Sequence, residues 1–385
     1  MRIALVSPYD WCVEGGVNAH ITHLASAFRG WGHEVTIFAP ASSPTTVAGE
    51  VVVMGRPHRV HASGSVARIT FAWKSPAVKE ALAAGKFDVV HLHEPLMPLL
   101  PYHFLRYSSA ANVGTFHAAK DGGNRMYGYT RPFARRWFRK LEGKIAVSPA
   151  AARLIGRYYS GYYNIIPNGI NYSHFAGETT ALEEFADDRC NILFVGRPEK
   201  RKGLKYLLRA YIRLHERGER VRLIVVGAGD FSRYERLMAP FPGVVFRSNV
   251  PYEALPRYHR SAHIFCSPAT GNESQGIALL EAMASGLAVV ASNIEGFAGV
   301  ITDEQEGLLV RPKDDEALAA AILRLSRDPQ LRARLGAAGQ AQAAHYSWDS
   351  IARRVLSYYE RLLYERRQVA EVRLLREHAQ PGAAG

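Results

Sequence analysis

Apolar residues along this chain alternate between short unbroken runs and longer stretches with helical spacing. In the first half, short runs typical of strands buried on both faces occupy residues 2–7, 35–39, 89–92 and 112–116. Between the first two runs, residues 17–28 place Ile21, Leu24, Ala25 and Phe28 on one face of a helix. Strands that alternate with helices in this way predict a parallel, doubly wound sheet.

A second series of the same kind begins near Asn191. Its short apolar runs occupy residues 192–195, 223–226, 263–266 and 287–291, with helical patterns between them. We expect a turn at residues 165–170, where the first series ends, and a polar link at residues 178–189. From Trp348 to His378 the spacing is helical, with little core of its own. A length of 385 residues also suits two domains better than one, which indicates two Rossmann-like units.

The segment between Gly271 and Gly286 carries two carboxylates. Glu273 lies in a glycine-rich loop, and Glu281 lies inside a short helix that is otherwise apolar. Burying a carboxylate without partners costs several kcal/mol, so Glu281 needs hydrogen-bond donors, and sugar hydroxyls would serve. The nearby start of the helix points free N–H groups outward, which suits a phosphate. The alternative is that Glu281 is the solvated edge of the helix and Glu273 an ordinary loop charge.

This block resembles the E-x7-E motif of the retaining family-four glycosyltransferases of the GT-B fold. The resemblance implies two Rossmann-like doubly wound parallel-sheet domains that face each other across a cleft: 1–168 on the acceptor side and 169–346 binding the nucleotide sugar. It also implies that a C-terminal helix, 347–378, crosses back to the first domain. Glu273 would hold the hydroxyls of the donor sugar and Glu281 those of the ribose, with Gly276 and Ile277 beside the donor.

A basic loop, Gly196-Arg-Pro-Glu-Lys-Arg-Lys-Gly203, follows one predicted strand and precedes a helix that begins near Leu204. Its four cations repel each other unless an anion or solvent screens them, so the loop either binds an anion or is a solvated basic loop. It resembles the family's G-R-x-x-x-x-K-G segment, with Arg197 and Lys202 as the two cations. The resemblance implies that both bind the donor diphosphate and stabilise it as the leaving group.

Two loops of the first half carry weaker signals. Gly15 and Gly16 let the backbone approach a diphosphate at the start of a helix, although a simple turn explains the pair equally well. His117 follows a predicted strand, where a lone histidine is more often structural. Both loops resemble donor-site segments of the family. The resemblance implies that Gly16 gives a backbone N–H to the phosphates and that His117 orients the sugar and shields positive charge at the anomeric carbon.

The segment His91-Leu-His-Glu94 allows a zinc-site interpretation, because H-x-H beside a carboxylate can ligate metal. No further Cys or His cluster in the sequence completes a shell, and we predict no metal site. The family resemblance implies that Arg197 and Lys202 take the place of a divalent ion. The nucleotide sugar is then a co-substrate, and no cofactor is expected.

The net charge of +13 implies an anionic partner. The most basic stretch lies between Lys120 and Lys144, where we expect a helix with Pro132 near its first turn. One side would carry Phe133, Trp137, Phe138 and Leu141, and the other Arg135, Arg136, Arg139 and Lys140. Such a helix suits an anionic membrane surface. The alternatives are a helix that packs its aromatic residues inward and a nucleic-acid binder, for which no binding-module signature is present.

Over nearly the whole chain the resemblance is greatest to the phosphatidylinositol mannosyltransferases, which work at the inner face of the plasma membrane. Residues 64–69, Gly-Ser-Val-Ala-Arg-Ile, resemble a segment near the acceptor site of that group. This implies that the acceptor is contacted by Tyr9, Asn18, Ser63 and Arg68. The chain departs from the group where Asn18 replaces a glutamine and where Gln275 replaces an aromatic residue of the E-x7-E block.

The sequence therefore predicts a retaining hexosyltransferase, with mannose and GDP-mannose favoured over a UDP-sugar. Its acceptor would be a hydroxyl of a lipid headgroup or lipid-linked glycan. Met1 begins a strand at once, leaving no room for a signal peptide, and three cysteines without a C-x-x-C suit a reducing compartment. We expect a cytoplasmic monomer, peripheral at the inner membrane face, that binds no nucleic acid. The alternatives are a soluble transferase of the same fold with a small-molecule acceptor and a nucleotide-sugar-binding protein without catalysis.

Overall fold

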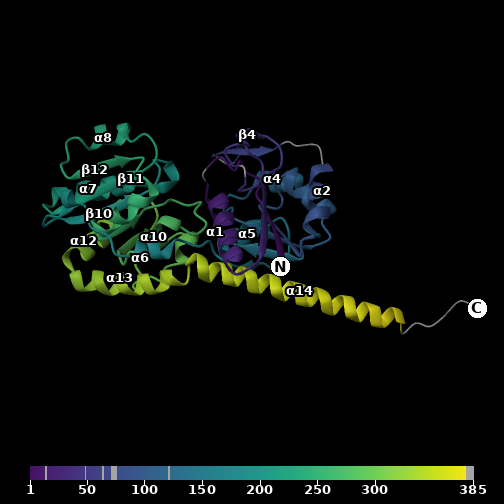
Figure 1. Cartoon of the computed structure of the whole chain (residues 1–385). Coiled ribbons are helices and arrows are strands. Elements are labelled where there is room, and N and C mark those ends of the chain that lie inside the picture. Colours follow the sequence, from purple (N-terminus) through teal and green to yellow (C-terminus); the bar gives the residue numbers. More distant parts are fainter. Residues whose placement is uncertain (14, 48, 63–64, 71–75, 120–121, 379–385) are drawn as a thin grey trace, which may run out of the picture.

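Two parallel sheets organise the chain, as the computed structural model shows (Figure 1). It describes residues 1–378 except 14, 48, 63–64, 71–75 and 120–121. The first sheet has the order β3-β2-β1-β6-β7-β8-β9 and the second the order β12-β11-β10-β13-β14-β15. All neighbouring strands within these two sheets are parallel, as the alternation of strands and helices predicts.

The strands of the first unit are β1 (Arg2–Val6), β2 (Glu34–Ala39), β3 (Val52–Val53), β6 (Val89–His93), β7 (Ala111–Phe116), β8 (Gly143–Ala146) and β9 (Asn164–Ile165), with an antiparallel pair formed by β4 (Pro57–Ala62) and β5 (Ser65–Thr70). Its helices are α1 (Gly16–Gly30), α2 (Pro76–Gly85), α3 (Leu100–Tyr107), α4 (Arg125–Phe138) and α5 (Pro149–Gly156).

The strands of the second unit are β10 (Cys190–Val195), β11 (Val221–Gly227), β12 (Val244–Ser248), β13 (Ile264–Ser267), β14 (Ala288–Ser292) and β15 (Leu308–Val310). Its helices are α6 (Tyr172–Ala176), α7 (Leu204–Glu216), α8 (Ser232–Met238), α9 (Leu255–Arg260), α10 (Ile277–Ala284), α11 (Glu295–Ala298), α12 (Asp315–Arg327) and α13 (Pro329–Ala344), with short 3-10 turns at Glu183–Phe185, Lys200–Lys202 and Tyr252–Ala254. Each strand expected from an apolar run is present, displaced by at most two residues at either end.

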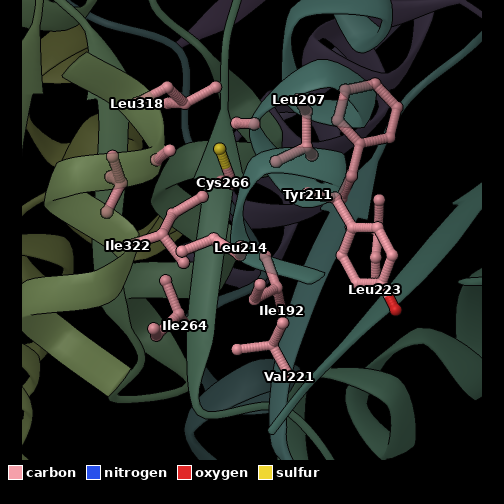
Figure 2. Close-up of a cluster of buried hydrophobic side chains, with 14 of the residues drawn as sticks. Ile192, Leu207, Tyr211, Leu214, Val221, Leu223, Ile264, Cys266, Leu318 and Ile322 are labelled. Carbon is pink, nitrogen blue, oxygen red and sulfur yellow. The ribbon is translucent and has the colours of Figure 1, made fainter. Parts of the chain in front are cut away.

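Apolar side chains cover both faces of each sheet. On one face of the second sheet, Leu207, Tyr211 and Leu214 of α7 pack against strand residues such as Ile192 and Leu223 (Figure 2). Burying each such Leu or Ile side chain contributes roughly 1.5–3 kcal/mol. The helical spacing of apolar residues in α7 is therefore what docks the helix onto the sheet. This docking also holds the loop between β10 and α7 at the carboxyl ends of the strands.

Helix α14 (Trp348–His378) leaves the second unit and lies along the first (Figure 1). Its residues Ile351, Val355 and Tyr359 are buried in one cluster with Ile21 and Phe28 of α1. The helix is stable because a neighbouring domain supplies the apolar surface that its own segment lacks. We therefore propose that the first domain comprises residues 1–168 with α14 and that the second comprises residues 169–346.

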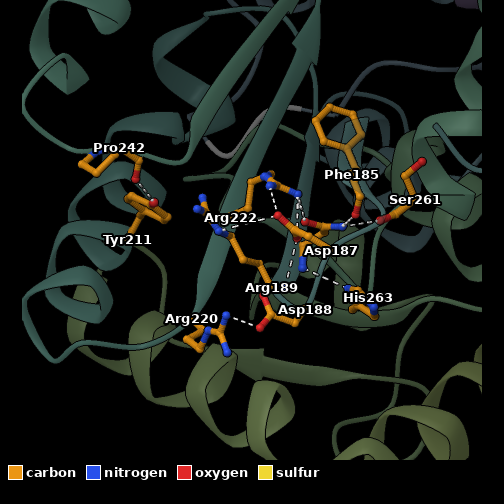
Figure 3. Close-up of polar contacts among 11 residues, drawn as sticks. Phe185, Asp187, Asp188, Arg189, Tyr211, Arg220, Arg222, Pro242, Ser261 and His263 are labelled. Atoms are coloured by element: carbon orange, nitrogen blue, oxygen red, sulfur yellow. Dashed lines mark hydrogen bonds and ion pairs between the residues drawn. The ribbon is translucent and has the colours of Figure 1, made fainter. Parts of the chain in front are cut away.

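The expected polar link at residues 178–189 is docked rather than free (Figure 3). Phe185 is buried, and the nearly buried guanidinium of Arg222 on β11 donates to Asp187 and, at 3.2 Å, to Asn191. The side-chain amide of Asn191 in turn donates to the backbone carbonyls of Phe185 and Ser261. The apolar ring and the paired charge together fix the link to the amino-terminal edge of the sheet, away from the strand ends that carry the site.

In each sheet the direction of strand order reverses beside the first strand. Strands β2 and β6 flank β1, and strands β11 and β13 flank β10. Ligands of open parallel sheets bind outside the carboxyl ends of the strands at such points. The loops that follow β1, β6, β10 and β13 are therefore the ones that the topology singles out, and the loop after β7 lies next to the loop after β6.

Candidate active site

The loop after β10 forms an alternating chain of charges with the loop after β13. Arg197 pairs with Glu199 at 3.0 Å, and Glu199 pairs with Arg201 at 2.7 Å. Oε1 of Glu273 lies 2.6 Å from Nη1 of Arg201 and 2.8 Å from Nζ of Lys202. The expected screening of these cations is therefore supplied by two carboxylates of the chain itself. Arg201 is a site residue that the sequence analysis did not assign, although it counted among the four cations of the loop.

The backbone explains why these two loops meet. Gly203 has φ of +72°, and a Cβ there would lie 1.8 Å from the carbonyl oxygen of Pro268, so only glycine fits. The backbone N–H of Thr270 donates to the carbonyl of Arg201 at 2.8 Å. The close approach at Gly203 and this hydrogen bond hold the basic loop against the segment that leads to Glu273.

Glu281 lies inside α10 and is buried, with 7% of its surface exposed, so it is not a solvated helix edge. Burial raises the pKa of its carboxyl from 4.5 to about 7, and a hydrogen bond from Tyr252 opposes this shift. The partner that burial requires is thus a tyrosine from a different loop, which no pattern in the sequence indicated. With its pKa near 7, Glu281 exchanges a proton in the neutral range unless further donors hold it ionised.

Helix α10 begins where Gly276 adopts φ of +80°, and a Cβ at this position would lie 2.5 Å from the ring of Phe297. Ile277, at the first turn, is 38% exposed, whereas Leu280 and Ala284 are fully buried. The apolar residues of this helix are therefore buried in its body, but its first residue is exposed. The N–H groups of Leu279 and Leu280 donate to the carbonyl of Gly276, so an anion at this helix start would bind to the N–H groups of Ile277 and Ala278.

His117, directly after β7, belongs to a cluster of histidines. Its Nε2 lies 2.9 Å from Nδ1 of His93, and its ring stands edge-on to that of His20 at 5.1 Å. Burial is the main cause that lowers the pKa of His20 to about 4 and holds the pKa values of His93 and His117 well below the usual range. The imidazole of His117 is therefore uncharged at neutral pH.

A buried carboxylate holds the backbone of this histidine loop. Glu94 accepts hydrogen bonds from the N–H groups of His117 and Ala118 at 2.8 and 3.0 Å, and from the hydroxyl of Tyr127 at 3.0 Å. Burial raises the pKa of Glu94, and these hydrogen bonds oppose the shift. The carboxylate of the H-x-H-E segment is therefore occupied in positioning the loop of His117.

The other residues of the H-x-H segment also have protein partners. His91 contacts the hydroxyls of Tyr359 and Thr115 through its two ring nitrogens, at 2.5 and 2.6 Å. Across the part of the chain that the structure describes, no three His, Cys, Asp or Glu side chains converge as they would around a metal ion. The contacts of His91 instead tie β6 to β7 and to α14.

The glycine loop and the expected acceptor residues differ in how open they are. A Cβ at Gly15 or Gly16 would meet nothing within 4 Å, so the start of α1 is accessible to a ligand. Asn18 is buried, and its amide accepts from Ser7 and donates to the carbonyls of Asp10 and Val13. Its side chain therefore shapes the loop. Tyr9 is partly buried near Glu94, and burial raises the pKa of its hydroxyl.

Two acceptor residues from the sequence are placed less fully. Ser63 lies outside the described residues. Arg68 lies on β5 of the antiparallel pair, which is separate from the first sheet.

The basic segment forms α4, but its faces differ from the expected ones. Asn124 caps the helix by accepting from the N–H of Met126, so the helix begins at Arg125 and Pro132 lies in its interior rather than in its first turn. Of the expected aromatic side, Phe138 and Leu141 are buried, but Phe133 is 80% exposed. Tyr129, one turn earlier, is 81% exposed. The apolar residues thus divide between the core and solvent.

Two lysines of the basic stretch bond to backbone carbonyls. Nζ of Lys140 donates to the carbonyls of Leu105 and Arg106 at the end of α3, and Nζ of Lys144 donates to the carbonyl of Leu141. Lys140 is nevertheless exposed, as are Arg135, Arg136 and Arg139. Cys12 is exposed, so it is not a packing residue, whereas Cys266 is buried. No helix within the described residues is both long enough and apolar enough to cross a membrane.

Known proteins are similar to this chain over most of its length. The model described as Glycosyl transferases group 1 matches residues 180–342, and the model described as Glycosyltransferase Family 4 matches residues 14–174. A phosphatidyl-myo-inositol mannosyltransferase of Mycolicibacterium smegmatis is 36% identical, over 94% of each chain. A D-inositol 3-phosphate glycosyltransferase of Acidothermus cellulolyticus is also 36% identical, over 97% of this chain and 93% of that protein.

Among solved structures, Anabaena Alr3699/HepE in complex with UDP and glucose is similar in fold. Its TM-score is 0.69 at 16% identity, over 94% of this chain and 99% of that one. The likeness confirms the GT-B arrangement of two Rossmann-like domains that the sequence predicts.

Proposed function

The chain belongs to the glycosyltransferases of group 1 and family 4, and we propose that it is a retaining mannosyltransferase with a membrane-bound acceptor. Transfer from a nucleotide sugar is the activity of the family. The sugar, the base, the stereochemical outcome and the acceptor are the parts that we propose. GDP-mannose is the favoured donor, since the mannosyltransferase of M. smegmatis is similar over 94% of this chain.

One observation carries the donor site: Arg201 and Lys202 both contact the carboxylate of Glu273. The network of Arg197, Arg201 and Lys202 with Glu199 and Glu273 has three positive and two negative charges, a net of one positive charge. A donor diphosphate would replace Glu273 as the partner of these cations. The carboxylate would then accept hydrogen bonds from the sugar hydroxyls. The site thus exchanges one set of charge-assisted bonds for another.

The uncharged state of His117 suits a position beside the donor sugar. Positive charge develops on the anomeric carbon as its bond to the diphosphate breaks, and an imidazolium nearby would oppose this charge. A neutral imidazole can donate or accept one hydrogen bond to a sugar hydroxyl without that penalty. The cations at the other end of the bond stabilise the departing phosphate.

We propose that retention follows a front-face route. The bond between the anomeric carbon and the phosphate oxygen breaks, and the acceptor oxygen forms its bond to the same face of that carbon. The departing phosphate oxygen takes the proton of the acceptor hydroxyl. Glu94 is engaged by the backbone and Tyr127, and Glu273 would accept hydrogen bonds from the sugar hydroxyls once the donor is bound, so we assign neither as a covalent nucleophile.

The proposed acceptor side faces an anionic lipid surface through α4. Tyr129 and Phe133 are one turn apart and about four-fifths exposed, at 81% and 80%. Arg135 and Arg136 are exposed on the same helix, and Arg139 is exposed directly after it. Exposed aromatic rings among arginines suit the boundary between lipid headgroups and acyl chains. This favours a peripheral protein of the cytoplasmic membrane face over a basic nucleic-acid binder.

The function is tested by transfer from a panel of GDP-, UDP- and ADP-sugars to phosphatidylinositol in vesicles, with nuclear magnetic resonance of the anomeric proton of the product. GDP-mannose should support turnover and give the same anomeric configuration as the donor. An inverted product would contradict retention. If the protein binds a donor but transfers sugar from none of the donors in the panel, the result would favour a nucleotide-sugar-binding protein without catalysis.

A second candidate is a transferase that acts on a small soluble acceptor. The D-inositol 3-phosphate glycosyltransferase of A. cellulolyticus, 36% identical over 97% of this chain, favours it. Equal turnover with free inositol phosphate and no binding to anionic vesicles would support this candidate against the first.

A further inference from the structure

Gln275 joins the donor loop to the connection between the domains. Its side-chain Oε1 accepts from the backbone N–H of Asn168 at 2.7 Å, and its Nε2 donates to the backbone carbonyl of the same residue at 2.9 Å. Gln275 is 2% exposed. The single buried side chain of Gln275 therefore hydrogen-bonds both the N–H and the C=O of Asn168, as the backbone of a neighbouring strand would.

The side chain of Asn168 continues the contact into the first domain. Its Oδ1 lies 3.0 Å from Nδ1 of His20, and the ring of His20 stands edge-on to that of His117 at 5.1 Å. A continuous path of contacts thus runs from Gln275 through Asn168 and His20 to His117. Gln275 is two residues from Glu273, so the path links the two proposed contacts of the donor sugar across the domains.

The chain crosses between the proposed domains a second time near Trp348, and this second crossing is hydrogen-bonded to the first at Ile170. The N–H of Ile170 donates to the carbonyl of Tyr346 at 2.8 Å, and the N–H of Trp348 donates to the carbonyl of Ile170 at 3.1 Å. Trp348 in turn stands edge-on to His20 at 5.2 Å. The two crossing segments therefore form one hydrogen-bonded unit, and Gln275 is the residue of the donor loop that is bonded to it.

We propose that Gln275 is a positioning residue that sets His117 relative to Glu273 by clamping Asn168. The inference rests on the proposed transfer reaction and adds the residue that aligns its two halves. A side chain that lacks either an acceptor or a donor, such as an aromatic ring or an aliphatic chain, cannot bond both backbone groups of Asn168.

The strength of such a clamp follows from burial. Removing the amide leaves a buried N–H and a buried C=O without partners, whereas a conservative change that keeps both roles preserves them. A protonated glutamic acid keeps both roles, because its carbonyl accepts and its hydroxyl donates. An ionised glutamate accepts from the N–H but repels the carbonyl oxygen of Asn168. Gln275→Glu is therefore a variant whose clamp is switched by protonation.

The test compares Gln275→Leu, Gln275→Glu and the wild type for kcat and for the KM of the donor between pH 5 and 8. Gln340, which donates to the carbonyl of Ala284 within the second domain, provides the matched controls Gln340→Leu and Gln340→Glu. Gln275→Leu should lower kcat by about 100-fold, the loss expected from misplaced reacting groups, and should change the donor KM much less. Gln275→Glu should recover kcat relative to the wild type as the pH falls.

Taking each rate relative to the wild type at the same pH removes the titration of shared neighbours. The titratable and charged groups around Gln275 are Glu273, Glu295 with its partner Arg153, Tyr346, and His20 and His117 beyond Asn168. A ratio for Gln275→Glu that is flat or falls toward low pH would overturn the proposal. The same acid recovery in Gln340→Glu would also overturn it.

A second readout needs no turnover. The amide hydrogen of Asn168 should exchange with solvent at least ten times faster in Gln275→Leu than in the wild type or in Gln340→Leu, by loss of about one buried hydrogen bond. Unchanged exchange in a folded Gln275→Leu protein would refute the clamp even if the transfer reaction is established. If exchange is faster in Gln275→Leu but the wild type transfers no sugar, the clamp would be supported and the proposed function would be refuted.

Discussion

Nζ of Lys202 lies 2.8 Å from Oε1 of Glu273, although the two residues come from loops after different strands of the second sheet. Arg201 contacts the same oxygen at 2.6 Å. Arg201 and Lys202 are therefore paired with Glu273, the carboxylate that is expected to bind the sugar. A donor must separate this ion pair and satisfy both partners at once.

Replacing Lys202 with alanine should lower kcat/KM for the donor by about 100-fold or more, because one of the charges that stabilises the leaving diphosphate is lost. Lys205→Ala provides a control, since Lys205 lies on the exposed side of α7 beside Tyr206. Steady-state kinetics with a nucleotide sugar measures the effect. Equal activity of the two variants would remove Lys202 from the diphosphate site.

Donor binding should release a proton from Glu281 below neutral pH. The free protein holds the pKa of this carboxyl at about 7, and ribose hydroxyls that donate to the carboxylate favour its ionised form. Affinity for an intact nucleotide sugar should therefore rise from pH 5 to about 7 and level off above it. Calorimetry in two buffers of different ionisation enthalpy measures the released proton.

Glu281→Gln is the control for this proton release, because an amide has the same shape and does not titrate. The variant should show weaker binding with no buffer dependence that originates from this position. Proton uptake by the wild type on binding would contradict a ribose contact through an ionised Glu281.

The histidine cluster should make the protein unstable to acid. Burial lowers the pKa of His20 to about 4, while the unfolded chain has the ordinary value of 6.5. As the pH falls from about 6.5 to 4, the unfolded state binds protons that the folded state does not, and the free energy of unfolding decreases. A shift of this size corresponds to about 3 kcal/mol for one buried histidine.

Urea unfolding at pH 7 and pH 5 measures this dependence. In His20→Asn the loss between the two pH values should be smaller than in the wild type. An equal loss would mean that His20 is protonated in the folded protein or solvated in a way that its 2% exposure does not allow.

Binding to anionic vesicles should depend on the exposed face of α4. Phe133→Ser combined with Tyr129→Ser should weaken vesicle binding several-fold without lowering stability, because both rings are mostly exposed. Tyr162→Ser is the matched control, since Tyr162 is 79% exposed and lies outside α4. Co-sedimentation with vesicles of stated anionic content is the measurement, and equal binding of all three proteins would assign α4 to solvent.

Changing Arg135, Arg136 and Arg139 to glutamate should abolish the same binding in low salt. Each basic residue near an anionic surface contributes about 1 kcal/mol, so three reversals outweigh the apolar contribution. Lys140→Glu alone should not act through the membrane, because Lys140 is bonded to the end of α3. Lys140→Glu should therefore lower the stability of the protein, while the folded molecules should still bind vesicles.

Local patterns recovered much of the architecture because they depend on neighbours in the chain. The strand before Arg197, the start of α7 at Leu204 and the full extent of α14 follow from apolar spacing and glycine positions. The start of α4 was wrong by about two turns because the cap of Asn124 outweighs the preference of Pro132 for a first turn. Phe133 was assigned to an apolar side, and only the packing of α4 on the sheet shows that it is exposed.

The sequence by itself determined two doubly wound sheets, a basic loop, two carboxylates with seven residues between them and the family motif that unites them. Only the tertiary structure decided what those groups contact: Arg201 beside Glu273, Tyr252 beside Glu281, and Gln275 on Asn168. The physical reason is range. Strand and helix patterns report burial within a few residues, whereas the contact of Gln275 with Asn168 joins residues 107 positions apart and depends on where both domains place them.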